Sequence, residues 1–268
     1  MVLTAASLLP VGSASADPAP PAPAPRAADA PEPAGTPDRA QPPKEGEPVA
    51  RERPREADEG AYDLAETAPA DADVRCTDES GPYQRQIERG LGLTVDGEQS
   101  AADCRAVRAF QTKQGIEPAI GFTGPVTWAS LQLAGARAHP NAAKKCPVRA
   151  YRVACVDLDR QLTWVQQGRK VVFGPVSVRS GRTGYDTRTG WYRVYWRDRD
   201  HVSSLYNSPM PYSQFFSGGQ AFHGVYGSIY TTVGSMGCVN MRLDHARTLW
   251  GLLKNEDRVY VWGRRPVV

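Results

Sequence analysis

The sequence predicts a multidomain protein in which a disordered N-terminal tail leads into a small all-α three-helix domain and then into a mainly-β domain, sandwich-like or barrel-like. Ala and Pro dominate residues 17–48, and mixed charges follow, so this part has too little apolar surface to offset chain entropy. Residues 76–135 carry helical periodicity, whereas residues 146–263 carry short runs rich in Val, Tyr and Trp.

The N-terminal segment has the features of an export signal. An apolar stretch, Val2–Ala14, ends in Ala14-Ser15-Ala16, and small residues in this pattern are typical of a cleavage site. We therefore expect residues 1–16 to be a signal peptide and residues 17–75 to be an extended linker. No run approaches membrane-spanning length, so we expect a secreted or cell-wall protein, outside the cytoplasm and without an integral membrane segment.

Three helices are predicted in residues 76–135. Tyr83, Ile87 and Leu91 recur at the spacing of one helical face. Ser100-Ala101-Ala102-Asp103 has the pattern of a capping box at the start of a second helix. A third helix is expected to begin at Gly124-Pro125, because Pro is favourable at the first helical position.

The remainder of the chain reads mainly as strands. The runs Tyr151–Val156, Gln161–Gln166 and Lys170–Val178 predict a β-meander, and Trp191–Trp196 and Arg258–Trp262 predict further strands. About 120 residues are enough for an independent core.

One helix is expected within this β domain. Ala246, Leu249, Trp250 and Leu253 follow the spacing of a helical face, and Asp244 is placed to cap its start. Such a helix would begin shortly after the last Cys of the chain.

Five Cys in an exported chain are expected to pair as four and leave one free. Cys76 with Cys104 and Cys146 with Cys155 are local pairs, and disulfides persist in an oxidising compartment. Cys238 is then the unpaired thiol. The alternative for Cys238 alone is a small buried core residue.

Cys238 lies in a segment with the features of a thiol nucleophile. A thiol needs a base near neutral pH, and His223, fifteen residues earlier, is the natural choice. Gly237 allows the backbone to approach a substrate carbonyl, and the peptide N–H groups from Gly237 to Val239 are placed to face an oxyanion. The pattern is that of a thiol acyltransferase.

The residues His223-Gly224 and Ser235-Met236-Gly237-Cys238-Val239-Asn240-Met241-Arg242 together resemble the motif of the L,D-transpeptidases, which cross-link peptidoglycan. The resemblance implies that Cys238 is the nucleophile, that His223 is the base, and that the Gly224 carbonyl holds the imidazole. It also implies loop roles for Ser235, Gly237 and Val239 and substrate contacts for Asn240 and Arg242. Met236 stands where the family has a His, and a thioether cannot donate a proton.

The resemblance extends over about residues 146–263. Gly181–Gly184 and Thr187–Gly190 resemble the Gly/Thr-rich segment that precedes the active-site strands of the family, and Ser208–Tyr212 resembles its substrate-side wall. Tyr212 is the substrate contact that this implies; packing of the same segment on the core is the alternative. The helical region resembles a small peptidoglycan-binding domain, against the alternative of a helical spacer.

The charge and the motifs of the sequence limit the classes of molecule that we expect the protein to bind. The formal net charge is +3, but from Pro147 onward seventeen Lys and Arg stand against eight Asp and Glu, which favours anionic wall polymers. No nucleic-acid motif and no recognised zinc spacing is present, so a zinc hydrolase using Cys238, His223 and His245 is remote. We expect peptidoglycan stem peptides and glycan strands as partners, no cofactor or metal, and a monomer.

Three functions remain open at the level of sequence. The first is the transpeptidase, in which Cys238 is acylated by a tetrapeptide stem, releases D-Ala and passes the acyl group to an amine of a neighbouring stem. The second is an L,D-carboxypeptidase with water as acceptor, which differs only in water exclusion at the acyl-enzyme. The third is a non-catalytic wall-binding protein whose thiol site has decayed.

Overall fold

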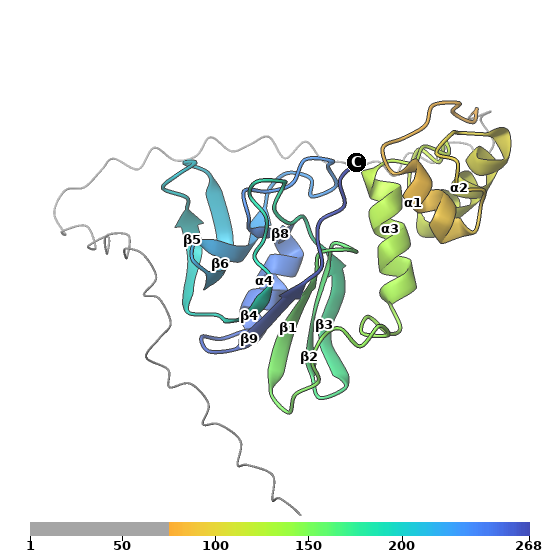
Figure 1. Cartoon of the computed structure of the whole chain (residues 1–268). Coiled ribbons are helices and arrows are strands. Elements are labelled where there is room, and N and C mark those ends of the chain that lie inside the picture. The colour runs from red at the N-terminus through yellow and green to blue at the C-terminus, as the bar shows by residue number, and fades with distance from the viewer. Residues whose placement is uncertain (1–74) are drawn as a thin grey trace, which may run out of the picture. The chain divides into compact units, whose positions relative to one another are not determined.

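A computed structural model describes residues 75–268, and Figure 1 shows its helices and strands. The expected signal peptide and nearly all of the expected linker lie outside the described residues. Within residues 75–268, no helix is both long enough and apolar enough to cross a bilayer.

Three helices occupy the first part of the described chain: α1 (Gln84–Leu91), α2 (Ala101–Gln114) and α3 (Pro125–Ala136). The capping box at α2 forms as the sequence predicts, because the Ser100 side chain accepts from the Asp103 N–H and the Asp103 side chain accepts from the Ser100 N–H. Gly124 is the N-cap of α3 and Pro is at its first position. Tyr83 stacks on Trp128 with ring centroids 4.8 Å apart, in a small core that includes Ile87.

The β domain contains two sheets. The strands are β1 (Arg152–Asp157), β2 (Leu162–Gln167), β3 (Lys170–Ser177), β4 (Gly190–Arg193), β5 (Trp196–Val202), β6 (Pro209–Ser217), β7 (Gln220–Val225), β8 (Val239–Arg242) and β9 (Arg258–Trp262). One sheet has the order β3-β2-β1-β9-β4 and the other has the order β5-β6-β7-β8. Helix α4 (Leu243–Leu252) follows β8 directly. The domain is therefore the mainly-β architecture that the sequence predicts.

The main core of this domain draws on both sheets and on α4. Val156 and Val261 contribute from the first sheet, Phe222 and Met241 from the second, and Leu249 from α4, and all five are buried. Burying one face of each sheet against this cluster leaves the other face of the β5–β8 sheet for the site residues described below. The strand alternation of side chains therefore decides which residues reach the site.

One of the strand predictions needs correction. The run Trp191–Trp196 is not one strand, because β4 ends at Arg193 and β5 begins at Trp196. Between them Val194 bonds to the backbone of Glu256 and Asp257 beside the first sheet, while the Tyr195 N–H donates to Phe215 in the second. The chain therefore passes from one sheet to the other within an aromatic-rich run that contains no Gly, Pro, Asn or Asp to indicate a turn.

The surroundings of α4 also differ from the prediction. The helix begins at Leu243, its N-cap is Arg242, and Asp244 lies in its first turn rather than at the cap. An acidic side chain there still favours the helix through the dipole. Strand β8 separates Cys238 from the helix, and the segment expected as a wall loop, Ser208–Tyr212, runs mostly into strand β6.

The disulfides join Cys76 to Cys104 and Cys146 to Cys155, and Cys238 is the free Cys within residues 75–268. This is the pairing that the spacing predicts. The first bond ties the segment before α1 to α2, and the second ties the entry of the β domain to β1.

Candidate active site

Parallel pairing of β7 with β8 places His223 and Cys238 on neighbouring strands. The register aligns Phe222 with Val239 and His223 with Asn240, and Cys238 immediately precedes β8. Phe222 and Val239 face the main core, so the alternating residues His223 and Cys238 face the opposite side of this sheet. Two residues that are distant in sequence are thereby brought to one face.

His223 is held in one tautomer by its own strand. Its Nδ1 lies 2.8 Å from the Gly224 carbonyl oxygen, and because a carbonyl can only accept, Nδ1 must carry the hydrogen. The side chain is buried, and this burial lowers the imidazole pKa to about 4 against the opposing hydrogen bond to Gly224. Nε2 is thus left unprotonated at neutral pH and available as a base.

Two neighbours act on the same imidazole. The Arg179 guanidinium lowers the His223 pKa by charge repulsion, whereas the nearby Asn240 side chain raises it. Arg179 and Asn240 are themselves joined by two backbone hydrogen bonds of 2.8 and 2.9 Å. The Asn240 side chain is buried, and its amide oxygen has no hydrogen-bond partner among the described residues.

Cys238 is partly buried against Met210, Phe215 and Ala221. Its Sγ lies 3.8 Å from the Gly219 carbonyl oxygen, to which the thiol donates. Burial raises the thiol pKa, so the resting group is a neutral thiol. The resting pair is therefore neutral thiol and neutral imidazole rather than an ion pair.

The loop before Cys238 is fixed by its own hydrogen bonds. Gly237 has φ +111°, and a Cβ there would lie 2.6 Å from Nε2 of Gln220, so a larger residue would strain the backbone and displace Gln220. The Ser235 hydroxyl donates to the Cys238 carbonyl at 2.5 Å and accepts from the Gly237 N–H at 3.1 Å. Ser235 thus closes the turn that presents the thiol.

A second segment, residues 179–188, holds this loop in place through hydrogen bonds. The Thr187 hydroxyl donates to the Gly237 carbonyl at 2.9 Å and accepts from the Gly181 N–H at 2.9 Å. The Ser235 N–H donates to the Ser180 carbonyl at 2.8 Å. Gln220 links the same segment to β7, because its amide group donates to the Asp186 carbonyl and accepts from the Arg188 N–H.

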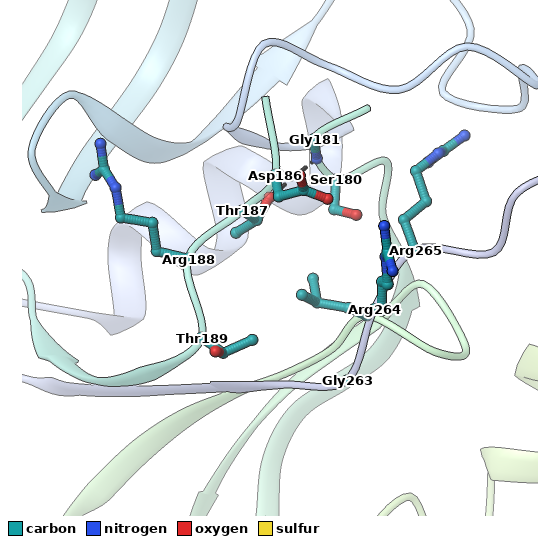
Figure 2. Close-up of a pocket in the computed structure, with 10 residues that line it drawn as sticks. Ser180, Gly181, Asp186, Thr187, Arg188, Thr189, Gly263, Arg264 and Arg265 are labelled. Carbon is teal, nitrogen blue, oxygen red and sulfur yellow. Dashed lines mark hydrogen bonds between the residues drawn. The ribbon is translucent and has the colours of Figure 1, made fainter. Parts of the chain in front are cut away.

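A cavity of about 320 Å³ lies beside this support segment. Figure 2 shows Ser180, Gly181, Asp186 and Thr187 gathered on one side of it, with the Arg188 side chain directed away from them. Cys238 does not line this cavity. His223 does not line it either, so this cavity is separate from the Cys238–His223 pair.

Of the other predicted substrate contacts, Asn240 lies at the site, whereas Arg242 and Tyr212 do not. Asn240 lies beside His223, as described above. Arg242 is exposed and pairs with Asp244 at 3.2 Å, at the start of α4. Tyr212 packs against the main core and lies 6.3 Å, centroid to centroid, from Trp250 of α4. It is not brought together with Met210, Phe215 and Ala221 beside Cys238.

The peptide groups expected to face an oxyanion are not equivalent. The Gly237 N–H is used by the Ser235 hydroxyl, and Val239 lies within the β7–β8 pair. The N–H of Cys238 is the remaining group of the three. The sequence alone did not distinguish these three.

Three residues that support the site were not singled out as site residues by the sequence. Thr187 fell within a Gly/Thr-rich segment that was noted without a role, whereas Gln220 and Arg179 had no local signal. Among residues 75–268, no group of three His, Cys, Asp or Glu side chains gathers in a way that would hold a metal ion.

Comparison with known proteins agrees with this geometry. Residues 151–261 match the YkuD family model, described as the L,D-transpeptidase catalytic domain. The crystal structure of an L,D-transpeptidase from Stackebrandtia nassauensis is 32% identical, the match covers 72% of this chain and 96% of that one, and the TM-score is 0.51. An L,D-transpeptidase structure from Xylanimonas cellulosilytica is 27% identical over 73% of this chain and 100% of that one, with a TM-score of 0.40. A search of curated proteins found no match. The fold, the matched domain and the 32% identical relative together show that this chain belongs to the L,D-transpeptidase family of enzymes.

Proposed function

We propose that this enzyme acylates Cys238 with a peptidoglycan tetrapeptide stem, releases D-Ala, and transfers the acyl group to an amine of a neighbouring stem. The observation that supports this most directly is the tautomer of His223. Its Nδ1–H donates to the Gly224 carbonyl at 2.8 Å, which leaves Nε2 as the acceptor for the Cys238 proton.

The proposed first step begins when the thiol turns from the Gly219 carbonyl toward His223. The sulfur bonds to the carbonyl carbon that precedes the terminal D-Ala, and the thiol proton passes to Nε2. The Cys238 N–H donates to the oxyanion of the tetrahedral intermediate. Collapse breaks the C–N bond, and the D-Ala amine leaves with the proton that His223 held.

In the second step a neutral acceptor amine attacks the thioester and expels the thiolate, while His223 removes the proton that the amine loses. Asn240 assists both steps in this proposal, because its unpartnered amide oxygen stabilises the imidazolium that forms each time. An acceptor that is water rather than an amine makes the same enzyme an L,D-carboxypeptidase.

Replacement of the nucleophile and of the base tests this assignment. Cys238→Ala is expected to abolish D-Ala release from a disaccharide-tetrapeptide, and His223→Ala to reduce single-turnover acylation by ~10²–10⁴-fold, as for loss of a general base. His245→Ala is the matched control. His245 is partly buried on α4 beside Asp244, and its loss should change acylation by less than about threefold.

Opposite results would reassign the chemistry. If His245→Ala stopped acylation while His223→Ala was tolerated, the assignment of His223 as the base would be wrong. Product analysis with and without an acceptor stem separates a cross-linked dimer from the tripeptide that water would give.

We further propose that the protein is exported and that the helical region, residues 76–135, binds peptidoglycan. Two disulfides support an oxidising compartment, and the basic charge of the chain from Pro147 onward favours anionic wall polymers. Sedimentation of the full chain with purified sacculi, compared with a chain lacking residues 76–135, tests the second part. Equal sedimentation of the two would remove it.

A further inference from the structure

A second cavity of the β domain lies apart from the groups assigned to the chemistry. It occupies about 380 Å³, and five of its seven lining residues are aromatic. It lies where the chain passes from β4 to β5 and so from one sheet to the other. Neither His223 nor Cys238 contributes to it.

The aromatic side chains that line the cavity differ in exposure: Phe216 is buried, whereas three others are about half-exposed. Phe216 is 3% exposed, and its ring centroid lies 5.7 Å from that of the partly buried Tyr192. The wall residues Tyr151, Trp191 and Tyr195 keep between 44% and 49% of their surface exposed. Three half-exposed aromatic rings around one hollow are costly to leave in water and are typical of a binding surface.

The polar groups of the cavity are cationic. Arg193 and Arg258 line it, and no Asp or Glu does. The Arg149 guanidinium lies 5.8 Å from the ring centroid of Trp191 and adds positive charge beside the cavity. Arg193 has an exposed ion pair with Glu256, and such pairs are weak, so a ligand can compete for it.

These two properties select one class of ligand. A pyranose ring presents C–H groups on its faces, which pack on aromatic rings, and hydroxyl or anionic groups at its edge, which guanidinium groups bind. A purely apolar ligand would leave the arginines unused, and a cationic ligand would be repelled. A sugar chain that bears anionic groups satisfies both.

The cavity is linked to the nucleophile through one glycine. The Gly219 N–H donates to the Tyr195 hydroxyl at 3.4 Å, and the Gly219 carbonyl accepts from the Cys238 thiol at 3.8 Å. A ligand packed on Tyr195 therefore lies beside the turn that faces the reacting sulfur. A polymer bound there would hold its own side branches near Cys238.

We propose that this aromatic cavity binds a wall glycan strand, with sugar rings packed on Trp191 and Tyr195 and anionic groups at Arg193 and Arg258. The choice of a wall glycan rests on the proposed function, but the binding itself does not require Cys238. The enzyme would thus hold the glycan to which a stem peptide is attached, in addition to the peptide.

Fluorine NMR of Trp191 tests ligand binding in this cavity. The full chain carrying Cys238→Ala is labelled with 5-fluorotryptophan, and the Trp191 resonance is assigned by its loss in Trp191→Phe. A peptide-free oligosaccharide of alternating N-acetylglucosamine and N-acetylmuramic acid is then titrated. A saturable shift of the Trp191 resonance is expected, and Arg258→Gln should weaken the apparent affinity by about fivefold or more.

Three comparisons make the result decisive. An uncharged N-acetylglucosamine oligomer of equal length should shift the same resonance with weaker affinity, and polyglutamate, which lacks sugar rings, should not shift it. Tyr226→Ala, an exposed aromatic outside the cavity, should leave the titration unchanged within about twofold. No saturable shift of Trp191, or an equal shift with polyglutamate, would overturn the glycan site.

The outcome is separable from the proposed chemistry. Because the titration uses Cys238→Ala and no turnover, its failure leaves the acyl-transfer proposal standing. Conversely, if the wild-type protein released no D-Ala, the acyl-transfer proposal would fail, but the titration would still test the glycan site.

Discussion

His223 combines two requirements that conflict in an exposed histidine. A base must be unprotonated to accept a proton, and it must keep one nitrogen aimed at the nucleophile. Burial meets the first by lowering the pKa to about 4, and the Gly224 carbonyl meets the second by fixing the hydrogen on Nδ1. Burial also raises the thiol pKa, so in the proposed mechanism proton transfer from Cys238 to His223 accompanies attack on the substrate carbonyl.

The depressed pKa of His223 predicts the pH dependence of acylation. The imidazole gains a proton only as the pH falls through about 4, so kcat/KM should be flat from about pH 5.5 to 8 and should fall only below about pH 4.5. An imidazole near its ordinary pKa of about 6.5 would place that fall two units higher. Single-turnover acylation measured in a series of constant-ionic-strength buffers distinguishes these. An acid limb near pH 6.5 would contradict the buried, neutral base.

Gly237 is the backbone position on which presentation of the thiol depends. Gly237→Ala would force a positive φ on an L-residue and place a Cβ 2.6 Å from Gln220, at a cost of roughly 1–3 kcal/mol. Acylation should fall by at least about tenfold, because small misplacements of reacting groups cost large factors in rate. Gly227→Ala is the control, since a Cβ there meets nothing within 4 Å. Similar melting temperatures and rates for the two variants would refute the role of Gly237.

At the scale of elements, the segment 179–188 acts as a scaffold under the catalytic loop. Thr187→Val removes the buried hydroxyl that joins the Gly181 N–H to the Gly237 carbonyl, and each unpaired buried group costs about 1–3 kcal/mol. We expect lower stability to urea and slower acylation. Thr187→Ser should restore both, and Thr189→Val, at an exposed position, should change neither. Unchanged stability and rate in Thr187→Val would contradict the role of the hydroxyl.

Elements with a strong local pattern could be predicted from the sequence, and those that depend on distant partners could not. The capping box at Ser100 and the meander of β1 to β3 have local causes, namely side-chain capping and tight turns. The break at Val194 depends on a backbone contact with Glu256 and Asp257, sixty residues away. Strand β8 is similar, because four residues become a strand only beside β7.

The same division applies to the site. Cys238, His223 and Gly224 lie in a motif that resembles that of the family, so their proposed roles could be assigned before the structure was known. Tyr212 could not be placed from sequence, because a left-handed conformation at that residue, with φ +61°, changes the face that its ring reaches. Thr187 donates to the Gly237 carbonyl, 50 residues away, and Gln220 bonds to the backbone of Asp186 and Arg188, 34 and 32 residues away. No local pattern in the sequence marks such contacts.

At the scale of the whole molecule, the disulfides stabilise regions that the chemistry does not use directly. Cys76→Ser with Cys104→Ser opens a loop with a sequence separation of 28, which should destabilise the helical region by about 4 kcal/mol. Acylation of a small donor should change by less than about twofold, since every reacting group lies in the β domain. Calorimetry together with the acylation rate checks both statements. A large loss of rate without unfolding of the β domain would show that the helical region takes part in the chemistry.

Cys238, the free thiol among residues 75–268, is the proposed acyl acceptor of this enzyme. Intact-mass analysis after incubation with a carbapenem, which resembles the acyl donor of the family, tests it most directly. We predict a single covalent adduct on the wild-type protein, located at Cys238 by peptide mapping, and no adduct on Cys238→Ala. An adduct that persists in Cys238→Ala, or a wild-type protein that remains unmodified while fully folded, would contradict the account.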